Sequence, residues 1–344
     1  MSQKMDKPIL IDALHITMGG GRGLLDYLVS CLIQRQVVLH LLRDERCSPL
    51  KEENIVGRVF VMADNGNDRK KFYKLHRNDY SSVLCFGNIP APIKMPCPVH
   101  TYVHNVVLLR IPKEFSFKMK LMAFLKRQYI RHLSSNTDSW IVQTQFTEDL
   151  LRKYMPCKGR QIVQFPFYNL PTDIVSAVKN SEHGEDYVLI GGYTWNRGHE
   201  ELVEAWGKLA EKGFKKKLHL TVRSTNLFQD VFDEAINKGA VIENHGFIPY
   251  EEVLKLYGHC KAIVYPSHGE SFGLGIVEAI SCGCDVLSSD LPFTYSVCKP
   301  SEVFEVDNPE AIAEAVMRYE KGDCVKSKLT VSDKINDLID YLTK

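Results

Sequence analysis

The amino-acid sequence predicts an α/β protein built from two Rossmann-like domains. Short runs of β-branched residues alternate with amphipathic segments of helical length along most of the 344 residues, a pattern typical of parallel sheets covered by helices. A stretch rich in Pro, Asn, Ser and acidic residues interrupts this pattern once, over residues 165–186, and the pattern then starts again. We therefore expect domains over residues 1–168 and 169–325 that face each other across a cleft.

The individual strands are predicted by their apolar runs. Those of the first half are residues 9–14, 37–42, 58–63, 82–86, 99–104 and 139–144, and those of the second half are residues 187–192, 218–223, 240–244, 262–266 and 285–289. Helical segments fit between most of them. Near the end of the chain, apolar side chains recur at helical spacing over residues 332–344. We expect residues 326–344 to provide a C-terminal helix that packs back on the first domain.

Composition narrows the class of protein. The chain is 44% hydrophobic and 25% charged, it has no apolar run of about 18 residues, and its first residues lack the apolar core of a signal peptide. We therefore expect a cytoplasmic protein. Ten cysteines without a Cys-x-x-Cys pair or the spacing of a zinc site indicate reduced, mostly buried thiols.

Charge is distributed unevenly between the two halves. Residues 1–170 contain 25 Lys and Arg against 14 Asp and Glu, a net charge of +11, whereas residues 171–344 contain 18 against 28, a net charge of −10. The basic half indicates an anionic partner or surface.

The segment "SHGESFGLGIVEA" (267–279) has the composition of a loop that leads into a helix. Its glycines allow close backbone approach, and free N–H groups from about Gly273 to Ile276 would bind an anion at the helix N-terminus, most often a diphosphate. Glu278 can accept hydrogen bonds from a ribose, and Glu270 from hydroxyls beyond the phosphates. The two glutamates together predict a nucleotide-sugar site. The same spacing would also arise if Glu278 interacted only with the helix dipole and Glu270 were only solvated.

The residues around this pair carry a family resemblance. The chain has Pro266, Ser267, Glu270, Phe272, Gly273, Glu278, Ala279 and Gly283. In this pattern, and in the flanking residues 245–267 and 285–297, it resembles the retaining family 4 glycosyltransferases, whose two Rossmann-like domains form the GT-B fold. The resemblance implies that Glu270 holds the donor sugar and Glu278 the ribose. We expect the donor also to contact Phe247, Ser271, Phe272, Gly273, Leu274 and Gly275, the last of which is Pro in many members.

The segment 191–206 resembles the family's donor-phosphate loop. Arg197 and Gly198 occupy the place of its Lys-Gly pair, and a guanidinium can hold a phosphate through two hydrogen bonds. The earlier Arg of the family pattern is missing, because Gly192 or Tyr193 falls there. Arg223, at the end of the strand predicted over residues 218–223, either supplies the missing charge or is an ordinary surface or structural arginine.

Two features of the first half also bear on the site. The loop "MGGGRG" (18–23) follows the first strand, but Leu24 in place of a third glycine and Arg43 in place of an acid argue against a dinucleotide dehydrogenase. The resemblance implies that Gly20 and Gly21 close on the donor instead. His104 ends a predicted strand, where it is either structural or, as the resemblance implies, a hydrogen-bond donor to the donor sugar.

Metal sites are not expected. The chain has no Asp-x-Asp pair, and the calcium-like start at residues 64–68 has Leu75 where a ligand would be required. We therefore expect neither a metal nor a cofactor, with Arg197 and the helix N-terminus neutralising the diphosphate.

Residues 113–133 mix basic with large apolar side chains. They form either a core helix with a solvated basic face or a helix that docks on an anionic membrane near a lipid-linked acceptor.

Together these features predict a metal-independent, retaining hexosyltransferase that transfers a sugar from a nucleotide-diphosphate-sugar to a hydroxyl of a glycan or lipid-linked glycan, in cell-surface polysaccharide biosynthesis. His104, Glu270 and Arg197 are its expected catalytic residues, its expected location is the cytoplasm or the inner face of the membrane, and no nucleic acid partner is expected. The alternatives are an epimerase or phosphorylase of the same fold, or an inert nucleotide-sugar-binding protein, which the missing arginine leaves open.

Overall fold

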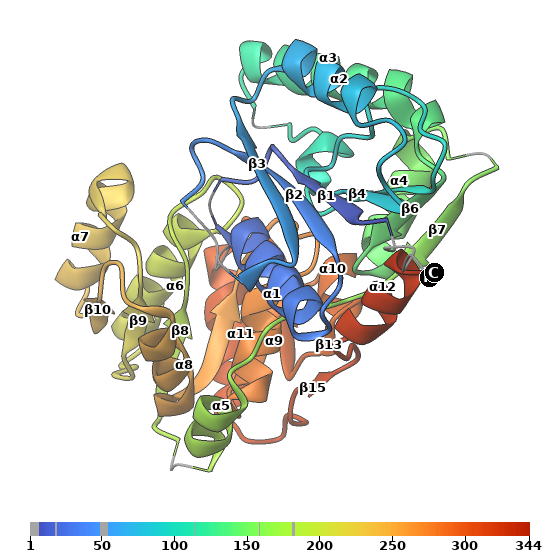
Figure 1. Cartoon of the computed structure of the whole chain (residues 1–344). Coiled ribbons are helices and arrows are strands. Elements are labelled where there is room, and N and C mark those ends of the chain that lie inside the picture. Colours follow the sequence, from blue (N-terminus) through green and yellow to red (C-terminus); the bar gives the residue numbers. More distant parts are fainter. Residues whose placement is uncertain (1–6, 18, 49–53, 114, 158, 181–182) are drawn as a thin grey trace. The chain divides into compact units, whose positions relative to one another are not determined.

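The computed structural model describes residues 7–344 except residues 18, 49–53, 114, 158 and 181–182. It divides into two compact units, one formed by residues 1–169 with 332–344 and the other by residues 170–331. Each unit contains a parallel sheet covered by helices (Figure 1). The predicted α/β class with two Rossmann-like domains is therefore confirmed.

The main sheet of the first unit has the strand order β3-β2-β1-β4-β5-β6-β7 and is parallel throughout. Its strands are β1 Ile9–Ala13, β2 Leu39–Asp44, β3 Gly57–Met62, β4 Ser82–Cys85, β5 Val99–Tyr102, β6 Ser139–Val142 and β7 Gln161–Gln164. All except β7 overlap runs predicted from the sequence. Strand β7 is a short edge strand that begins and ends with Gln, so it lacks the apolar run of a buried strand.

Alternate side chains of β1 pack on opposite faces of this sheet. Ile9 and Ile11 belong to the hydrophobic cluster that contains helix α1 (Gly20–Gln34), whereas Leu10 packs with Phe72 of helix α2 (Gly66–Leu75). Helix α2 begins where the calcium-like residues 64–68 lie, and the side chain of Asn65 caps it by accepting from the N–H of Asn67. The residues that looked like a calcium loop therefore start a helix.

The C-terminus of the chain belongs to the first unit. Helix α12 (Ile335–Leu342) buries its apolar face in the cluster that contains α1, and Arg35, the residue after α1, forms an ion pair with Asp340 at 2.5 Å. The boundary lies at 331/332 rather than at the expected 325/326, because strand β15 (Lys328–Leu329) pairs with β13 (Cys298–Lys299) in the second unit.

Helix α3 (Phe117–Leu133) exposes most of its apolar side chains. Only its last turn contributes buried residues, Ile130 and Leu133. The exposed apolar side chains are Phe117, Met119, Leu121, Met122, Phe124, Leu125 and Tyr129, with Phe117 84% exposed. The expected core helix with a basic solvated face therefore describes only its C-terminal end. Helix α4 (Gln145–Tyr154) follows β6 and packs on it.

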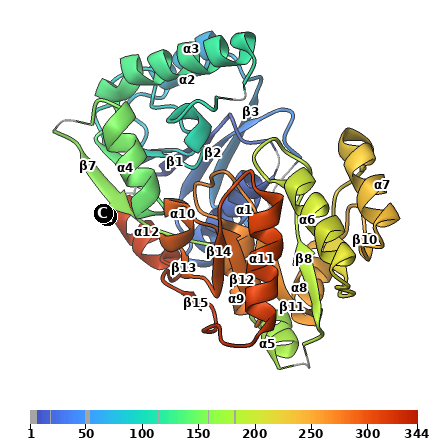
Figure 2. The same cartoon turned by 180° about the vertical axis from the view of Figure 1, so that it is seen from behind.

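The main sheet of the second unit has the strand order β10-β9-β8-β11-β12-β14 and is also parallel. Its strands are β8 Asp186–Leu189, β9 Leu218–Leu220, β10 Ile242–Asn244, β11 Cys260–Tyr265, β12 Asp285–Ser289 and β14 Glu302–Phe304. Figure 2 shows α6 (His199–Glu211) beside α11 (Pro309–Glu320), and these two helices are in contact. Helices α7 (Gln229–Asn237), α8 (Tyr250–His259), α9 (Leu274–Ser281) and α10 (Pro292–Tyr295) complete the unit.

The stretch predicted to link the two domains contains a helix. Helix α5 (Thr172–Lys179) packs on α8, where a Cβ atom at Gly258 would lie 2.0 Å from the side chain of Val178. The absence of a side chain at Gly258 therefore allows this close contact. The sequence prediction missed α5 because it is short and lies among turn-forming residues.

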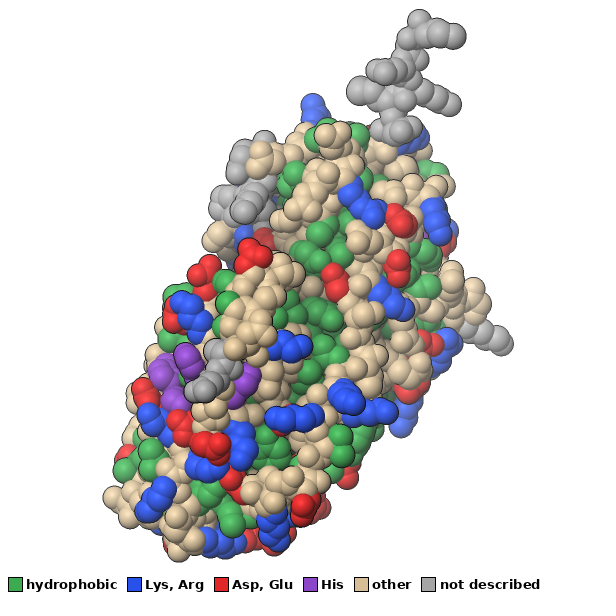
Figure 3. Space-filling model, turned by 90° about the horizontal axis from the view of Figure 1, so that it is seen from below, with side chains coloured by type: hydrophobic (Ala, Val, Ile, Leu, Met, Phe, Trp, Pro, Cys, Tyr) green, Lys and Arg blue, Asp and Glu red, His purple; other side chains and the backbone are tan. Residues whose placement is uncertain are grey.

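The surface mixes charges of both signs. Figure 3 shows Lys and Arg interspersed with Asp and Glu over one face, and local ion pairs such as that of Lys216 with Glu185, at 2.5 Å, accompany this mixture. Within the described part of the chain, no helix is both long enough and apolar enough to cross a membrane.

Candidate functional site

Two loops at the carboxyl edge of the second sheet are hydrogen-bonded to each other. One joins β8 to α6, and the other joins β11 to α9. The Asn196 carbonyl accepts from the hydroxyl of Ser267 at 3.0 Å and from the N–H of His268 at 2.8 Å, while the Asn196 amide donates to the Gly269 carbonyl at 3.1 Å. Ligands of parallel α/β sheets bind at this edge, so the paired loops mark the candidate donor site.

Gly198 allows the two loops to approach. It adopts the left-handed conformation, with φ of 65°, just before α6. A Cβ atom on it would lie 2.5 Å from the carbonyl oxygen of Pro266, closer than Cβ atoms in proteins approach non-bonded neighbours. This position therefore needs glycine both for its backbone angle and for the contact.

Arg197 is held at the inner end of its loop. Its Nη1 donates to the carbonyl of Ile190 at 3.0 Å, and its side chain is largely enclosed. The nearby Tyr265 hydroxyl and Glu270 carboxylate raise the pKa of Arg197. The guanidinium is therefore a fixed positive charge among the residues that the sequence predicted for the donor.

Glu270 is oriented by two hydroxyl groups. Its Oε1 accepts from Tyr265 at 3.1 Å and lies 3.1 Å from the Ser267 hydroxyl, whose one hydrogen is shared with the Asn196 carbonyl, and the side chain remains partly exposed. Tyr265 ends strand β11, and Ser267 is the residue whose hydroxyl also reaches the other loop. The position of Glu270 is thus fixed by the same contacts that join the two loops.

Helix α9 begins directly after this loop, with Gly273 as its N-cap at φ of 77°. The N–H of Ile276 donates to the Gly273 carbonyl at 2.9 Å, so the sequence prediction of a free donor at Ile276 was wrong. The first turn closes one residue earlier than expected. Phe272 is buried in the loop, whereas Ser271, Leu274 and Gly275 are partly exposed.

Glu278 lies in the second turn of α9 and is only 6% exposed. Burial raises the pKa of its carboxyl group to about 7, against opposing contributions from a hydrogen bond with Tyr250 and from the charge of Arg197. Tyr250 begins helix α8 and was not predicted as a site residue, although it lies within the stretch 245–267 that carries the resemblance.

Arg223 and Phe247 form a pair of their own. The Arg223 guanidinium lies over the Phe247 ring at 5.3 Å from its centroid, and both side chains are exposed. They follow β9 and β10, the outer strands of this end of the sheet. Thr221, which follows β9 closely, contacts the Arg197 loop, where its hydroxyl accepts from the Gly191 N–H at 2.8 Å.

In the first unit, the structure places the glycine-rich loop against His104. Helix α1 begins at Gly20, and a Cβ atom on Gly21 would lie 3.2 Å from Nε2 of His104. Met18 of the loop lies outside the described residues. The predicted residues Gly21 and His104 are therefore neighbours.

His104 is held by a side chain that the sequence prediction missed. The Asn88 Oδ1 accepts from the backbone N–H groups of His104 and Asn105, at 2.8 and 3.0 Å, and the amide of Asn88 lies 3.3 Å from Nε2 of His104. Burial lowers the pKa of His104 to about 4, so the imidazole is neutral at physiological pH. Asn88 follows β4 and adopts a left-handed backbone conformation, with φ of 67°.

Two groups among the described side chains have ligand atoms close enough to hold a metal ion. They are His219 with Glu243 and His245, and Glu201 with His268 and Asp307. The first group lies on strands β9 and β10 and at the residue just after β10, and the second includes a residue of the Glu270 loop. Neither group was predicted from the sequence.

Comparison with known proteins gives a family match that lies mainly in the second unit. The family model "Glycosyl transferases group 1" matches residues 173–333. The O-antigen chain mannosyltransferase B of Escherichia coli is 46% identical over 46 residues, which are 13% of this chain and only 12% of the length of that protein.

Solved structures resemble the chain over nearly its whole length. The structure of Anabaena HepE, in complex with UDP and glucose, has a TM-score of 0.64 at 14% identity and covers 92% of this chain and 90% of its own. The lipopolysaccharide outer core galactosyltransferase WaaB has a TM-score of 0.64 at 12% identity, over 98% of this chain and 94% of its own. Residues 173–333 therefore match the group 1 glycosyltransferase family model, and the chain has the GT-B fold.

Proposed function

We propose that the chain transfers a hexose unit from a nucleotide-diphosphate-sugar to a hydroxyl group of a glycan or lipid-linked glycan. The observation that carries this proposal is the pair of joined loops that holds Arg197 and Glu270 beside the start of α9. A cation, a carboxylate and a helix N-terminus in one place match the diphosphate and the hydroxyl groups of such a donor.

The second unit supplies the donor contacts. Arg197 and the backbone N–H groups at the start of α9 bind the diphosphate, Glu270 accepts from the sugar hydroxyls, and Glu278 accepts from the ribose. The exposed Phe247 ring, with Arg223 over it, offers a face for the nucleoside base. The guanidinium and the helix N-terminus stabilise the charge that develops on the leaving diphosphate, so transfer proceeds without a metal ion at this site.

The reaction retains the configuration of the donor sugar. The acceptor oxygen forms its bond to the anomeric carbon on the face from which the diphosphate departs, and a phosphate oxygen takes the acceptor proton. Neutral His104 donates a hydrogen bond to the donor sugar rather than acting as a base, and Gly20 and Gly21 allow the backbone close approach to the donor. The low pKa of His104 supports this role, because a neutral imidazole can donate at any pH above about 4.

The acceptor belongs to surface polysaccharide synthesis at the inner face of a membrane. Two relatives support this part of the proposal by their names, an O-antigen chain mannosyltransferase and a lipopolysaccharide outer core galactosyltransferase. Helix α3 supports it physically, because exposed Lys118, Lys120 and Lys126 lie among its exposed apolar side chains and the helix contains no acidic residue.

The test is donor turnover in the presence of EDTA. UDP-, GDP- and ADP-sugars are screened for thermal stabilisation of the protein and for release of nucleoside diphosphate with a glycan acceptor. One nucleotide series should stabilise the protein and turn over. Arg197→Ala should lower kcat by about 10²-fold or more, because it removes a charge that stabilises the leaving group. Arg318→Ala, which removes an exposed arginine paired with Glu302, is the matched control.

Three outcomes would contradict the proposal in different ways. Binding without nucleotide release in any acceptor mixture would identify an inert nucleotide-sugar-binding protein. Turnover that requires a divalent ion would remove the metal-independent mechanism. Full activity of Arg197→Ala with loss of activity in Arg223→Ala would transfer the phosphate contact to Arg223.

A further inference from the structure

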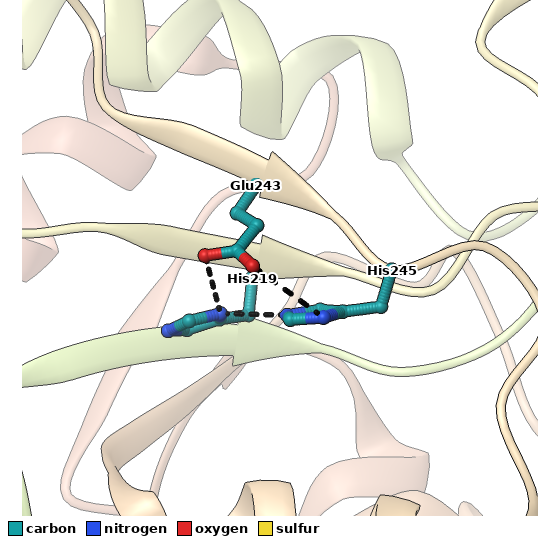
Figure 4. Close-up of side chains that lie close together, drawn as sticks. All are labelled: His219, Glu243 and His245. Carbon is teal, nitrogen blue, oxygen red and sulfur yellow. Dashed lines mark hydrogen bonds and ion pairs between the residues drawn. The ribbon is translucent and has the colours of Figure 1, made fainter.

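A group of two histidines and a glutamate lies on the edge of the second sheet, apart from the loops of Arg197 and Glu270. Strands β9 and β10 pair in parallel with His219 opposite Glu243. His245 follows Glu243 by two residues and so lies on the same face of the sheet. Figure 4 shows the three side chains converging.

The two imidazole rings each direct one nitrogen atom toward the other ring. Nδ1 of His219 lies 2.9 Å from Nε2 of His245, and the rings are nearly parallel, with an angle of 19° between their planes. Two neutral imidazole nitrogens that face each other at this distance need one hydrogen between them. A metal ion can replace that hydrogen after the rings separate by a few tenths of an ångström, because nitrogen ligands about 2.0–2.1 Å from a tetrahedral metal ion lie about 3.3 Å from each other.

The carboxylate completes a ligand set. Its Oε2 lies 4.0 Å from Nδ1 of His219, and its Oε1 lies 3.7 Å from Nδ1 of His245. Glu243 is exposed, so rotation about its side-chain bonds can bring one oxygen to the ion. Two imidazoles and one carboxylate are a ligand set of zinc enzymes and of other divalent transition metals, whereas Mg²⁺ prefers oxygen ligands alone.

The second nitrogen of His219 also has a suitable partner. Its Nε2 lies 3.4 Å from Oδ2 of Asp186 on the neighbouring strand β8. A carboxylate that accepts from the distal nitrogen of a metal-binding histidine fixes the ring and its tautomer. The group therefore contains a ligand set together with the carboxylate that commonly supports one.

We propose that His219 Nδ1, His245 Nε2 and a Glu243 oxygen bind one divalent transition-metal ion of the zinc class, with water in the remaining positions. The ion joins the short edge strand β10 to β9 and so stabilises this edge of the second unit. This site takes no part in the proposed transfer reaction, whose diphosphate contacts come from other loops.

Lys217 limits the affinity of the site. Its ammonium group lies 2.7 Å from Oε2 of Glu243 and competes with a metal ion for the carboxylate. Removing this ammonium group frees the oxygen and also removes a positive charge close to the ion. The proposal therefore makes opposite predictions for two neighbouring side chains, since loss of His245 weakens binding whereas loss of Lys217 strengthens it.

The experiment is a zinc titration of the full chain without a polyhistidine tag, after treatment with EDTA and its removal. Calorimetry with ZnCl₂ should give one tight site per chain and a higher melting temperature, and MgCl₂ should give neither. His245→Ala should weaken zinc binding by about 100-fold, Asp186→Asn by about 10-fold, and Lys217→Ala should tighten it. The melting temperature of each variant in EDTA checks that it remains folded.

Two further variants separate this site from other sources of zinc affinity. His132→Ala removes an exposed histidine of the first unit and should leave binding unchanged. His268→Ala disrupts the group of Glu201, His268 and Asp307, whose ligand atoms also lie close together. The proposal is wrong if the folded protein binds no zinc, if His245→Ala binds it as tightly as the unmodified chain, or if only His268→Ala abolishes binding.

Discussion

The buried carboxyl group of Glu278 destabilises the folded protein when it ionises, and the same residue is proposed to bind the ribose. Burial raises the pKa of its carboxyl group from 4.5 to about 7, so the folded state favours the protonated form. The free energy of unfolding therefore falls as pH rises from about 4.5 to about 7, because the unfolded chain loses this proton before the folded protein does, and the full loss remains above that range. Glu278→Gln should stabilise the protein by up to about 3 kcal/mol at pH 8 and by much less at pH 5, as measured by denaturant unfolding.

The same substitution should weaken the binding of the nucleoside diphosphate. In its proposed role the ionised carboxylate accepts from both ribose hydroxyls. Nucleotide affinity should therefore rise as pH increases through about 7, and this component should be absent in Glu278→Gln. Glu305→Gln, at an exposed position in the same unit, is the control for both measurements. Equal stability of Glu278→Gln and the unmodified chain at pH 8 would show that the buried carboxyl group does not ionise at a cost.

Individual site residues differ in how well the sequence predicts them. The proposed site residues Arg197, Glu270 and Glu278 lie in short segments, so a local pattern in the sequence was enough to propose them. Asn88 and Tyr250 act on residues that are distant in sequence, and their proximity follows from the order of parallel strands and the packing of helices. The sequence prediction had no local signal for such contacts.

At the scale of elements, Gly198 determines how the loop before α6 meets the loop after β11. An alanine there would need a left-handed backbone and would place its Cβ atom against the Pro266 carbonyl. Gly198→Ala should therefore destabilise the second unit by about 2 kcal/mol or more and raise the KM for the donor, because the contacts that orient Glu270 shift with the loop. Thermal unfolding and donor kinetics measure the two effects.

Gly213 offers a matched control for this prediction. It also has a positive φ, 86°, but a Cβ atom there would have no neighbour within 4 Å. Gly213→Ala should thus incur only the backbone strain, on the order of 1 kcal/mol, with donor kinetics unchanged. If Gly198→Ala and Gly213→Ala were equally stable and equally active, the close contact of the two loops would have no energetic role.

The sequence predicted whole elements best where both faces are buried. Central strands such as β1 and β11 are mostly apolar, with one charged residue each, and were found directly. The prediction missed β7 and β14, because edge strands of this length are only partly buried and contain polar residues. It missed α5 for a related reason, since most of its residues are exposed and only Val178 is buried.

At the scale of the whole molecule, α3 belongs to the half of the chain that has a positive net charge. Residues 1–170 have a net charge of +11, and α3 adds exposed apolar side chains to this basic background. An anionic membrane would attract the charge over the Debye length and accept the apolar side chains at the surface. Salt weakens the electrostatic attraction but not the insertion of apolar side chains, so the two contributions can be measured separately.

We predict that the protein binds vesicles that contain anionic lipid and that Lys118→Glu with Lys120→Glu weakens this binding by about 30-fold or more at low salt, since each lysine contributes about 1 kcal/mol. Phe117→Ser with Met122→Ser should instead remove the part of the binding that survives high salt, because those two side chains are 84% and 61% exposed.

Lys215→Glu with Lys255→Glu is the control, because it changes the net charge equally on the second unit and should have a smaller effect. Co-sedimentation measures all four proteins, and equal losses in the two lysine pairs would show that net charge alone, rather than α3, determines membrane binding.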